Sequence, residues 1–350
     1  MNLYSTPSPA HRFPLQRLGT AAALACGVLL LAACGGGGDG TTPATATPLS
    51  QPDATADSAN ATATGSDTAS ALDTVIDTTT ALAQATAQSA AASSDREQAL
   101  SAAPAAATGI TNVSVACAGG GTATLSVTGG TAASELNGQL DAGEHYSVTY
   151  AQCAGQAGAA QLNGSVVMDV TSADHGTSPS SVAVALTVTG LALTLPAGTA
   201  TLDGAATVSR SVVADGGTTV TTSHVTVPSA TLATAFNARN GTFTLSGLDA
   251  TRTVTSVGGI ATASQYSGHH TLAGDANGRT FSLNVSTTGN VDYDATGALV
   301  SGAWTVVRPH ATIATTVANG TVVMTVDDGN DGTIDHTWTF PAAQLAAAAS

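Results

Sequence analysis

The fold class is decided by the stretch Val182-Ala183-Val184-Ala185-Leu186-Thr187-Val188-Thr189-Gly190-Leu191-Ala192-Leu193-Thr194-Leu195. Large apolar residues occupy every second position up to Val188, and they do so again from Leu191, but on the opposite phase. Alternation with a period of two predicts a β-strand that has one apolar and one polar face. A glycine at the change of phase predicts a bulge or corner at Gly190. Such a long, bent strand favours a barrel-like or sandwich domain over a flat sheet.

The same alternation recurs along the chain, in sets of apolar residues that share one parity: Val113, Val115 and Cys117; Tyr146, Val148 and Tyr150; Phe281, Leu283 and Val285; Ile334, His336, Trp338 and Phe340. Turn-forming Gly, Asn and Asp residues separate these segments, for example at 215–217, 258–259 and 319–320. We therefore predict an all-β fold, an antiparallel meander of long hairpins forming a barrel-like or sandwich domain over residues 108–341.

A Leu-x-Gly motif recurs about every forty residues, at 162–164, 202–204 and 245–247, and each copy opens a strand. The motif indicates either a duplicated hairpin unit or a combination that is simply common in a glycine-rich β chain. Both alternatives stay open at the level of sequence.

Residues 1–33 have the pattern of a targeting segment. Arg12 and Arg17 form a positive region, and an apolar run of about sixteen residues follows from Leu18, which suits a signal peptide and is short for a membrane span. We expect this segment to be removed from the mature protein.

The apolar run ends in Leu31-Ala32-Ala33-Cys34, and Gly35 follows. This tetrapeptide resembles the lipobox of bacterial lipoproteins, and the composition resembles Gly- and Thr-rich β-sheet outer-membrane lipoproteins of Gram-negative bacteria. The resemblance implies cleavage before Cys34, lipidation of its thiol and acylation of the new amine, so that the membrane partner is reached through an N-terminal lipid anchor. Several acyl chains make such attachment effectively permanent. In that family an Asp after the Cys favours the inner membrane, so Gly35 indicates the outer membrane. A plain secretory signal is the alternative.

The segments on either side of the β domain differ from it in composition. Residues 34–66 consist mainly of Thr, Ala, Pro, Asp and Gly and predict a disordered tether, because they cannot bury enough apolar surface to fold. Residues 67–107 are rich in Ala and predict a helical spacer, in which apolar residues recur at spacings of three and four. Residues 342–350 are predicted to be a disordered tail.

The charge balance excludes one class of partner. The eight basic residues are all Arg, and removal of two with residues 1–33 leaves six against 23 acidic residues, a formal charge of −17. Nucleic-acid binding requires clustered cations that neutralise phosphates. We therefore expect no nucleic-acid partner; a protein or glycan partner in the envelope cannot be named from the sequence.

Two cysteines, Cys117 and Cys153, remain in the mature chain besides Cys34. In an oxidising compartment a single pair of this kind predicts a disulfide, and closing a loop of this length would contribute about 4 kcal/mol on the chain-entropy model. A metal pair or a catalytic thiol is the alternative, although neither Cys has a Cys or His at ligand spacing.

The segment Asp327-Asp328-Gly329-Asn330-Asp331-Gly332-Thr333-Ile334-Asp335 resembles the calcium loops of EF-hand and dockerin-like repeats. The resemblance assigns Asp327, Asp331, Thr333 and Asp335 as candidate Ca²⁺ ligands. It is incomplete, because Gly329 stands where a third side-chain oxygen is expected. The alternative is a hairpin turn, in which Asp, Asn and Gly are ordinary residues. No other cofactor is predicted.

No catalytic residue is assigned, because the sequence has no His-Glu-x-x-His, no Gly-x-Ser-x-Gly, no phosphate loop and no cysteine pair at zinc spacing. Adjacent strand residues point to opposite faces, so His269 and His270 are not expected to share one metal and are interpreted as a surface hairpin position. His336, between Ile334 and Trp338, is interpreted as a hydrogen-bonded core or cavity histidine.

These observations together predict a non-catalytic, lipid-anchored cell-envelope protein whose β domain has a structural or binding role at the outer membrane. A carrier or chaperone that cups an apolar ligand in a curved sheet is the first alternative. A hydrolase of envelope polymers is the second.

Overall fold

The computed structural model describes residues 48–92, 110–117, 119–130, 134, 137–154, 161–195, 198–236, 239–276 and 279–349. The helices are α1 (Gln51–Ala92) and α4 (Ala342–Ala349). The strands are β1 (Ile110–Ala116), β2 (Thr122–Thr128), β3 (His145–Ala154), β4 (Gln161–Asp174), β5 (Ser180–Leu195), β6 (Gly198–Asp215), β7 (Thr218–Phe236), β8 (Arg239–Val257), β9 (Ile260–Ala276), β10 (Arg279–Thr287), β11 (Val291–Asp294), β12 (Leu299–Arg308), β13 (Ala311–Ala318), β14 (Thr321–Asp328) and β15 (His336–Pro341).

The strands form one antiparallel sheet in which β1 to β10 and then β12 to β15 follow one another in sequence order. The short strand β11 lies off this path and pairs with β9 and β12. The predicted antiparallel meander of hairpins is thereby confirmed.

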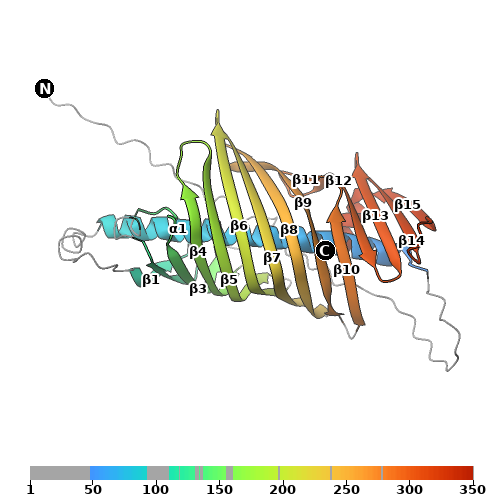
Figure 1. The fold of residues 1–350 in the computed structure, drawn as a ribbon, viewed down its shortest axis with the longest axis horizontal. Coiled ribbons are helices and arrows are strands. Elements are labelled where there is room, and N and C mark those ends of the chain that lie inside the picture. The colour runs from blue at the N-terminus through green and yellow to red at the C-terminus, as the bar shows by residue number, and fades with distance from the viewer. Residues whose placement is uncertain are drawn as a thin grey trace.

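Helix α1 runs across the strands on one side of the sheet (Figure 1), and we call this side the inner face. Its 42 residues span about 63 Å at 1.5 Å per residue. The fourteen strands of the pairing path, spaced about 4.8 Å apart, give a sheet about 62 Å wide. The helix is therefore about as long as the sheet is wide, and it covers the inner face from β12–β13 at its N-terminal end to β1 at its other end.

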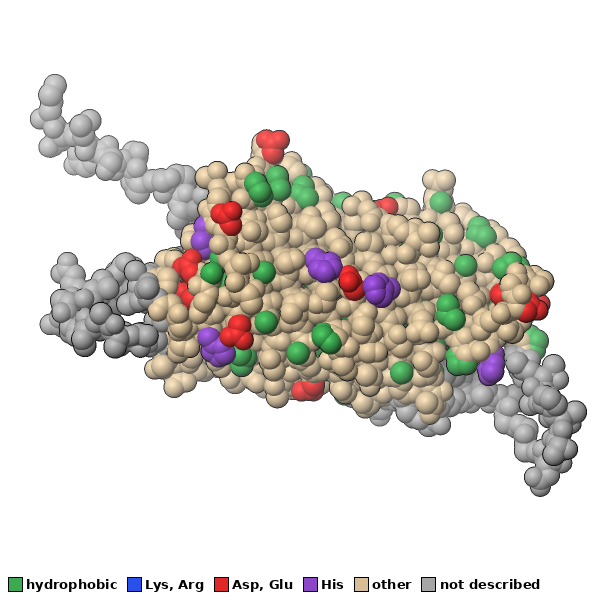
Figure 2. All heavy atoms as spheres, in the orientation of Figure 1, with side chains coloured by type: hydrophobic (Ala, Val, Ile, Leu, Met, Phe, Trp, Pro, Cys, Tyr) green, Lys and Arg blue, Asp and Glu red, His purple; other side chains and the backbone are tan. Residues whose placement is uncertain are grey.

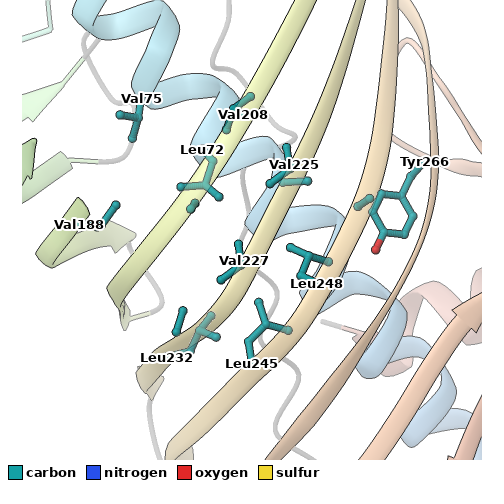
Figure 3. Close-up of a cluster of buried hydrophobic side chains, with 14 of the residues drawn as sticks. Leu72, Val75, Val188, Val208, Val225, Val227, Leu232, Leu245, Leu248 and Tyr266 are labelled. Carbon is teal, nitrogen blue, oxygen red and sulfur yellow. The ribbon is translucent and has the colours of Figure 1, made fainter. Parts of the chain in front are cut away.

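The core lies between α1 and the inner face. Side chains alternate between this layer and solvent along each strand, as in β13, where Ala311, Ile313, Thr315 and Val317 are buried and the residues between them are not. Figure 3 shows the middle of this layer, where Leu72 of α1 lies among side chains of the long central strands. Burying each large aliphatic side chain there contributes about 1.5–3 kcal/mol relative to exposure.

Glycine bulges bend the long strands. The predicted bulge at Gly190 is confirmed, since the β5–β6 register shifts between Val188 and Leu191 and Gly190 has a φ of 54°. The glycines of all three Leu-x-Gly motifs, Gly164, Gly204 and Gly247, also have positive φ, and the strand register shifts next to each. The motif therefore marks places where the pairing register of a strand shifts, as in a β-bulge.

Gly164→Ala is expected to destabilise the protein by about 2–4 kcal/mol, because a β-carbon there would lie 2.1 Å from the carbonyl oxygen of Gly190 and the φ of Gly164 is 106°. Gly216→Ala is the matched control. Gly216 also has positive φ, 56°, but nothing lies within 4 Å of a β-carbon there, so only the backbone cost of about 1–2 kcal/mol remains. Urea unfolding of both variants tests this, and equal losses would contradict the steric explanation.

Two predictions about the segments that flank the β domain are wrong. The tether predicted over 34–66 and the spacer predicted over 67–107 meet inside α1, which is a continuous helix from Gln51. The tail predicted over 342–350 forms α4, whose Leu345 is buried and which packs against α1. Residues 34–47, 93–107 and 350 lie outside the described residues, as does the signal segment 1–33.

Residues 51–66 are helical because of local hydrogen bonds that their composition does not predict. Ser50 caps it, accepting the Asp53 N–H and donating its hydroxyl to the Asp53 carboxylate. Several threonine hydroxyls in α1 donate to the carbonyl four residues earlier, as Thr64 does to Asn60 at 2.8 Å. The buried residues Thr55, Thr64, Thr68 and Thr86 thereby satisfy their hydroxyl groups within the helix. No helix in the described part of the chain is long and apolar enough to cross a membrane.

Candidate functional site

The groove formed by the inner face and occupied by α1 is the candidate functional site. The six consecutive residues 57–62 of α1 are all buried, although they cover more than one full turn. The helix is therefore enclosed on all sides there, by the sheet and by α4. This enclosure is possible because these residues, Asp, Ser, Ala, Asn, Ala and Thr, have small side chains.

Three arginines of the inner face pair with aspartates of α1. Arg308 of β12 lies 2.5 Å from the Asp57 carboxylate, and Arg252 of β8 lies 3.0 Å from that of Asp73. Both aspartate side chains are buried. In the third pair Arg210 of β6 contacts Asp77, whose side chain is exposed, so that pair contributes little to stability.

The sequence reading missed these pairs, although a signal for them exists. Arg252 has the same parity on β8 as the buried residues Leu248 and Ala250, and Arg210 has that of Val208 on β6. A cation at an inward position of a strand requires a partner on the element that covers it. The aspartates of the segment read as tether and spacer supply that partner.

The N-terminal part of α1 is held by a buried polar cluster. The Trp304 Nε1–H donates to the Ser58 hydroxyl at 2.8 Å, and Ser58 in turn lies 2.6 Å from the Thr315 hydroxyl. Next to them, burial raises the pKa of Asp57 to about 7, an effect that the Arg308 guanidinium opposes and that the Asp53 carboxylate adds to. Asp57 and Arg308 are in ionic contact without the alignment of a hydrogen bond.

A buried histidine and tyrosine meet the middle of α1. His270 Nε2 donates to the Ala61 carbonyl at 3.0 Å. This approach depends on Gly65, where a β-carbon would lie 2.4 Å from the Tyr266 hydroxyl and 2.6 Å from the His270 ring. Burial lowers the pKa of His270 to about 4, and the hydrogen bond to Ala61 opposes the shift, so the imidazole is neutral at physiological pH.

The described part of the groove leaves little room for a ligand. A small apolar pocket lies between α1 and β5–β7, where Thr68, Leu72, Val188, Leu202 and Val227 line it, and its free space of about 10 Å³ holds about one water molecule. Ligand pockets are typically about 300–1,000 Å³. The groove as it stands holds α1 and does not present an open cavity for an acyl chain.

The predicted disulfide is confirmed. Cys117, at the end of β1, is bonded to Cys153 of β3 with a Cα–Cα distance of 5.4 Å. The bond bridges over β2, and the backbone hydrogen bond from Gly119 N–H to the Ala154 carbonyl, 2.8 Å, supports the same corner. It fastens the edge strand β1 to the body of the sheet.

The aspartate-rich segment 327–335 begins with the last two residues of β14 and continues as the connection to β15. The Asp327 carboxylate accepts the N–H groups of Asp331 at 3.1 Å and Gly332 at 2.8 Å, and Asp331 accepts that of Thr333. The Asp335 carboxylate accepts the backbone N–H of Asp328, the last residue of β14, at 2.8 Å. This is the hydrogen bonding of the turn alternative, and calcium binding by Asp327, Asp331, Thr333 and Asp335 stays a prediction.

The histidines occupy other places than predicted. His269 and His270 lie on opposite faces, as expected, but in the middle of β9, so the interpretation as a surface hairpin position is wrong. His336 is not in the core, since its half-exposed ring stacks on Trp338 with centroids 5.3 Å apart and contacts Asp328 at 3.2 Å.

The chain was also compared with known protein families, with characterised proteins and with solved structures, and none of them matches it. The groove is therefore interpreted from its own chemistry. It places a neutral histidine, a tyrosine and two ion pairs with buried aspartates against the chain's own helix rather than toward solvent, an arrangement that holds α1 in place.

Proposed function

We propose that this chain is a non-catalytic, lipid-anchored protein of the cell envelope, whose β domain has a structural or binding role at the outer membrane. The observation that carries the proposal is the occupation of the inner face by α1 across the width of the sheet. Because α1 occupies the groove, a partner binds to the opposite, outer face of the sheet or to its edges. For the same reason the groove has no room for a deep substrate pocket.

The chemistry of the outer face supports a binding role. It presents threonine and serine hydroxyls from neighbouring strands, such as Thr222 and Thr253, whose oxygens are 3.3 Å apart. Figure 2 shows this face with acidic and histidine side chains and, within the described residues, no Lys or Arg. Such a surface suits hydrogen bonding to a protein or a glycan and not to a polyanion.

The compartment of the proposal is supported by the Cys117–Cys153 disulfide, because disulfides persist in oxidising compartments such as the periplasm. The anchor is inferred from the sequence of residues 31–35 alone, since Cys34 lies outside the described residues.

Cys34→Ser is expected to abolish incorporation of a labelled fatty acid and to move the protein from the membrane to the soluble fraction of the producing bacterium, because the acylated thiol is lost. Cys26→Ser is the matched control: it removes another cysteine of the N-terminal segment and is expected to keep the label and the membrane location. Labelling that survives in the Cys34 variant would disprove the anchor and, with it, this proposal.

A further inference from the structure

Three metal-ligand side chains lie together on the outer face of the central strands. His224 belongs to β7, Asp249 to β8 and His269 to β9, and all three are exposed. Asp249 pairs directly with His269 in the β8–β9 register. His224 pairs with Thr251, two residues from Asp249, in the β7–β8 register.

The distances that these positions impose are short. His224 Nε2 lies 2.9 Å from Asp249 Oδ1. Directly opposed residues of an antiparallel pair have β-carbons about 4.5–5.5 Å apart. The His269 side chain therefore leaves the backbone beside the side chain of Asp249, the same carboxylate that His224 contacts. The three strands are 19, 19 and 17 residues long and each is paired on both sides, which makes the backbone under the three side chains rigid.

Two imidazole nitrogens and one carboxylate oxygen form a donor set that suits first-row transition-metal ions such as Zn²⁺. Arg210 of β6 and Arg252 of β8, the nearby arginines whose side chains are described, do not oppose a cation there, because they point to α1 on the inner face. The formal charge of the whole chain is −15.

Metal binding requires one side chain, that of His269, to rotate. In the described part of the chain no three His, Cys, Asp or Glu side chains already converge in a geometry that could hold a metal ion. The side chain of His269 is exposed, so its ring can rotate toward Asp249 without breaking core packing.

We propose that His224, Asp249 and His269 bind one divalent transition-metal ion, with Zn²⁺ as its representative, on the outer face of β7–β9. The ion takes the place between His224 Nε2 and the Asp249 carboxylate, and His269 is the third ligand. Since three protein ligands leave at least one coordination position open, the bound ion could also be contacted by a carboxylate or imidazole of a partner. This site is independent of the proposed lipid anchor.

The chain contains its own control site. His145 of β3 lies 2.5 Å from Asp169 of β4 on the same outer face, but the strand neighbours on either side of this pair are Thr128 and Ala185. That pair therefore has one histidine and one carboxylate and lacks the second histidine.

Calorimetric titration of the purified full chain with Zn²⁺ is expected to give one site. His224→Ala, Asp249→Asn and His269→Ala are each expected to weaken binding by about tenfold or more, and His145→Ala is expected to leave it unchanged. Circular dichroism of each variant checks that it is folded. In the unmodified protein, Zn²⁺ is also expected to protect His224 and His269, but not His145, from acylation by diethyl pyrocarbonate.

The proposal is overturned by any of three results. Wild-type affinity in His269→Ala would reduce the site to the His224–Asp249 pair. An equal loss in His145→Ala would show diffuse binding to exposed histidines. A titration without binding, together with unprotected His224 and His269, would show that no site exists.

Discussion

Replacing Arg308 with Met is expected to leave the protein nearly as stable as wild type at pH 6 and to destabilise it increasingly above pH 7, by about 3 kcal/mol at pH 9. The reason lies in Asp57, whose pKa is raised by burial to about 7 while the Arg308 guanidinium lowers it. Without Arg308 the pKa of Asp57 rises further. Asp57 then has to be buried either as an unpaired anion or as a neutral acid at a pH where the acid ionises in the unfolded chain.

The direction in which stability changes with pH follows from proton binding by Asp57. The folded-state pKa of Asp57 is above its ordinary value of 3.8, so the stability that Asp57 contributes is complete below about pH 4 and is lost as the pH rises toward 7. In wild type this loss ends near pH 7. In the variant it continues at about 1.4 kcal/mol per pH unit, because the folded protein still binds the proton that the unfolded chain has released.

The measurement is urea unfolding of both proteins between pH 5 and pH 9, expressed as the difference in free energy of unfolding. His270, whose pKa is lowered to about 4 by burial, destabilises the fold as the pH falls from 6.5 toward 4, but it is present in both proteins and cancels in the difference. The matched background is Asp57→Asn, in which Arg308→Met is expected to have the same effect at every pH. A difference that does not vary with pH in the Asp57 protein would contradict the assigned role of this pair.

The β domain could be predicted from the sequence because its signal is local. Apolar and polar residues alternate along strands that have one buried and one exposed face. The change of phase at Gly190 predicts a bulge, and the shift in the β5–β6 pairing register confirms it. The disulfide could be predicted because one cysteine pair remains in an oxidising compartment and neither Cys has a Cys or His at ligand spacing.

Helix α1 could only partly be predicted, because its stability is not local. Its apolar stripe includes Leu72 and Ile76, but residues 51–66 have the composition of a disordered segment. They are helical because the sheet and α4 enclose them and because Ser50 caps them. The polar contacts of the groove depend on residues that are far apart in the sequence, such as Ser58 and Trp304. No spacing rule within one segment connects such residues.

The double substitution Ser58→Cys with Thr315→Cys is expected to link α1 to β13 by a disulfide and to raise the free energy of unfolding by up to about 5 kcal/mol. The two hydroxyl oxygens are 2.6 Å apart and both residues are buried, so two sulfurs fit with little movement. The new bond would join positions 257 residues apart, which restricts the unfolded chain strongly. Loss of the Trp304 hydrogen bond to Ser58 subtracts about 1 kcal/mol.

This locked protein also separates the proposed function from the carrier alternative. If α1 is a permanent part of the core, a fluorescent fatty acid is expected to bind neither the wild type nor the locked protein. The reference level of fluorescence is that of the Ser58→Cys single variant, and neither protein is expected to exceed it. A carrier would have to release α1 from the groove, because the described pocket there has a free space of only about 10 Å³.

Fatty-acid binding by the wild type that is lost on locking, and regained when reductant opens the new bond, would therefore show that α1 moves and that the inner face is the ligand site. Because the same reductant also opens the Cys117–Cys153 bond, the reference for that step is reduced wild type. Under the proposed function the lock changes stability alone, since the face that meets a partner is the outer one.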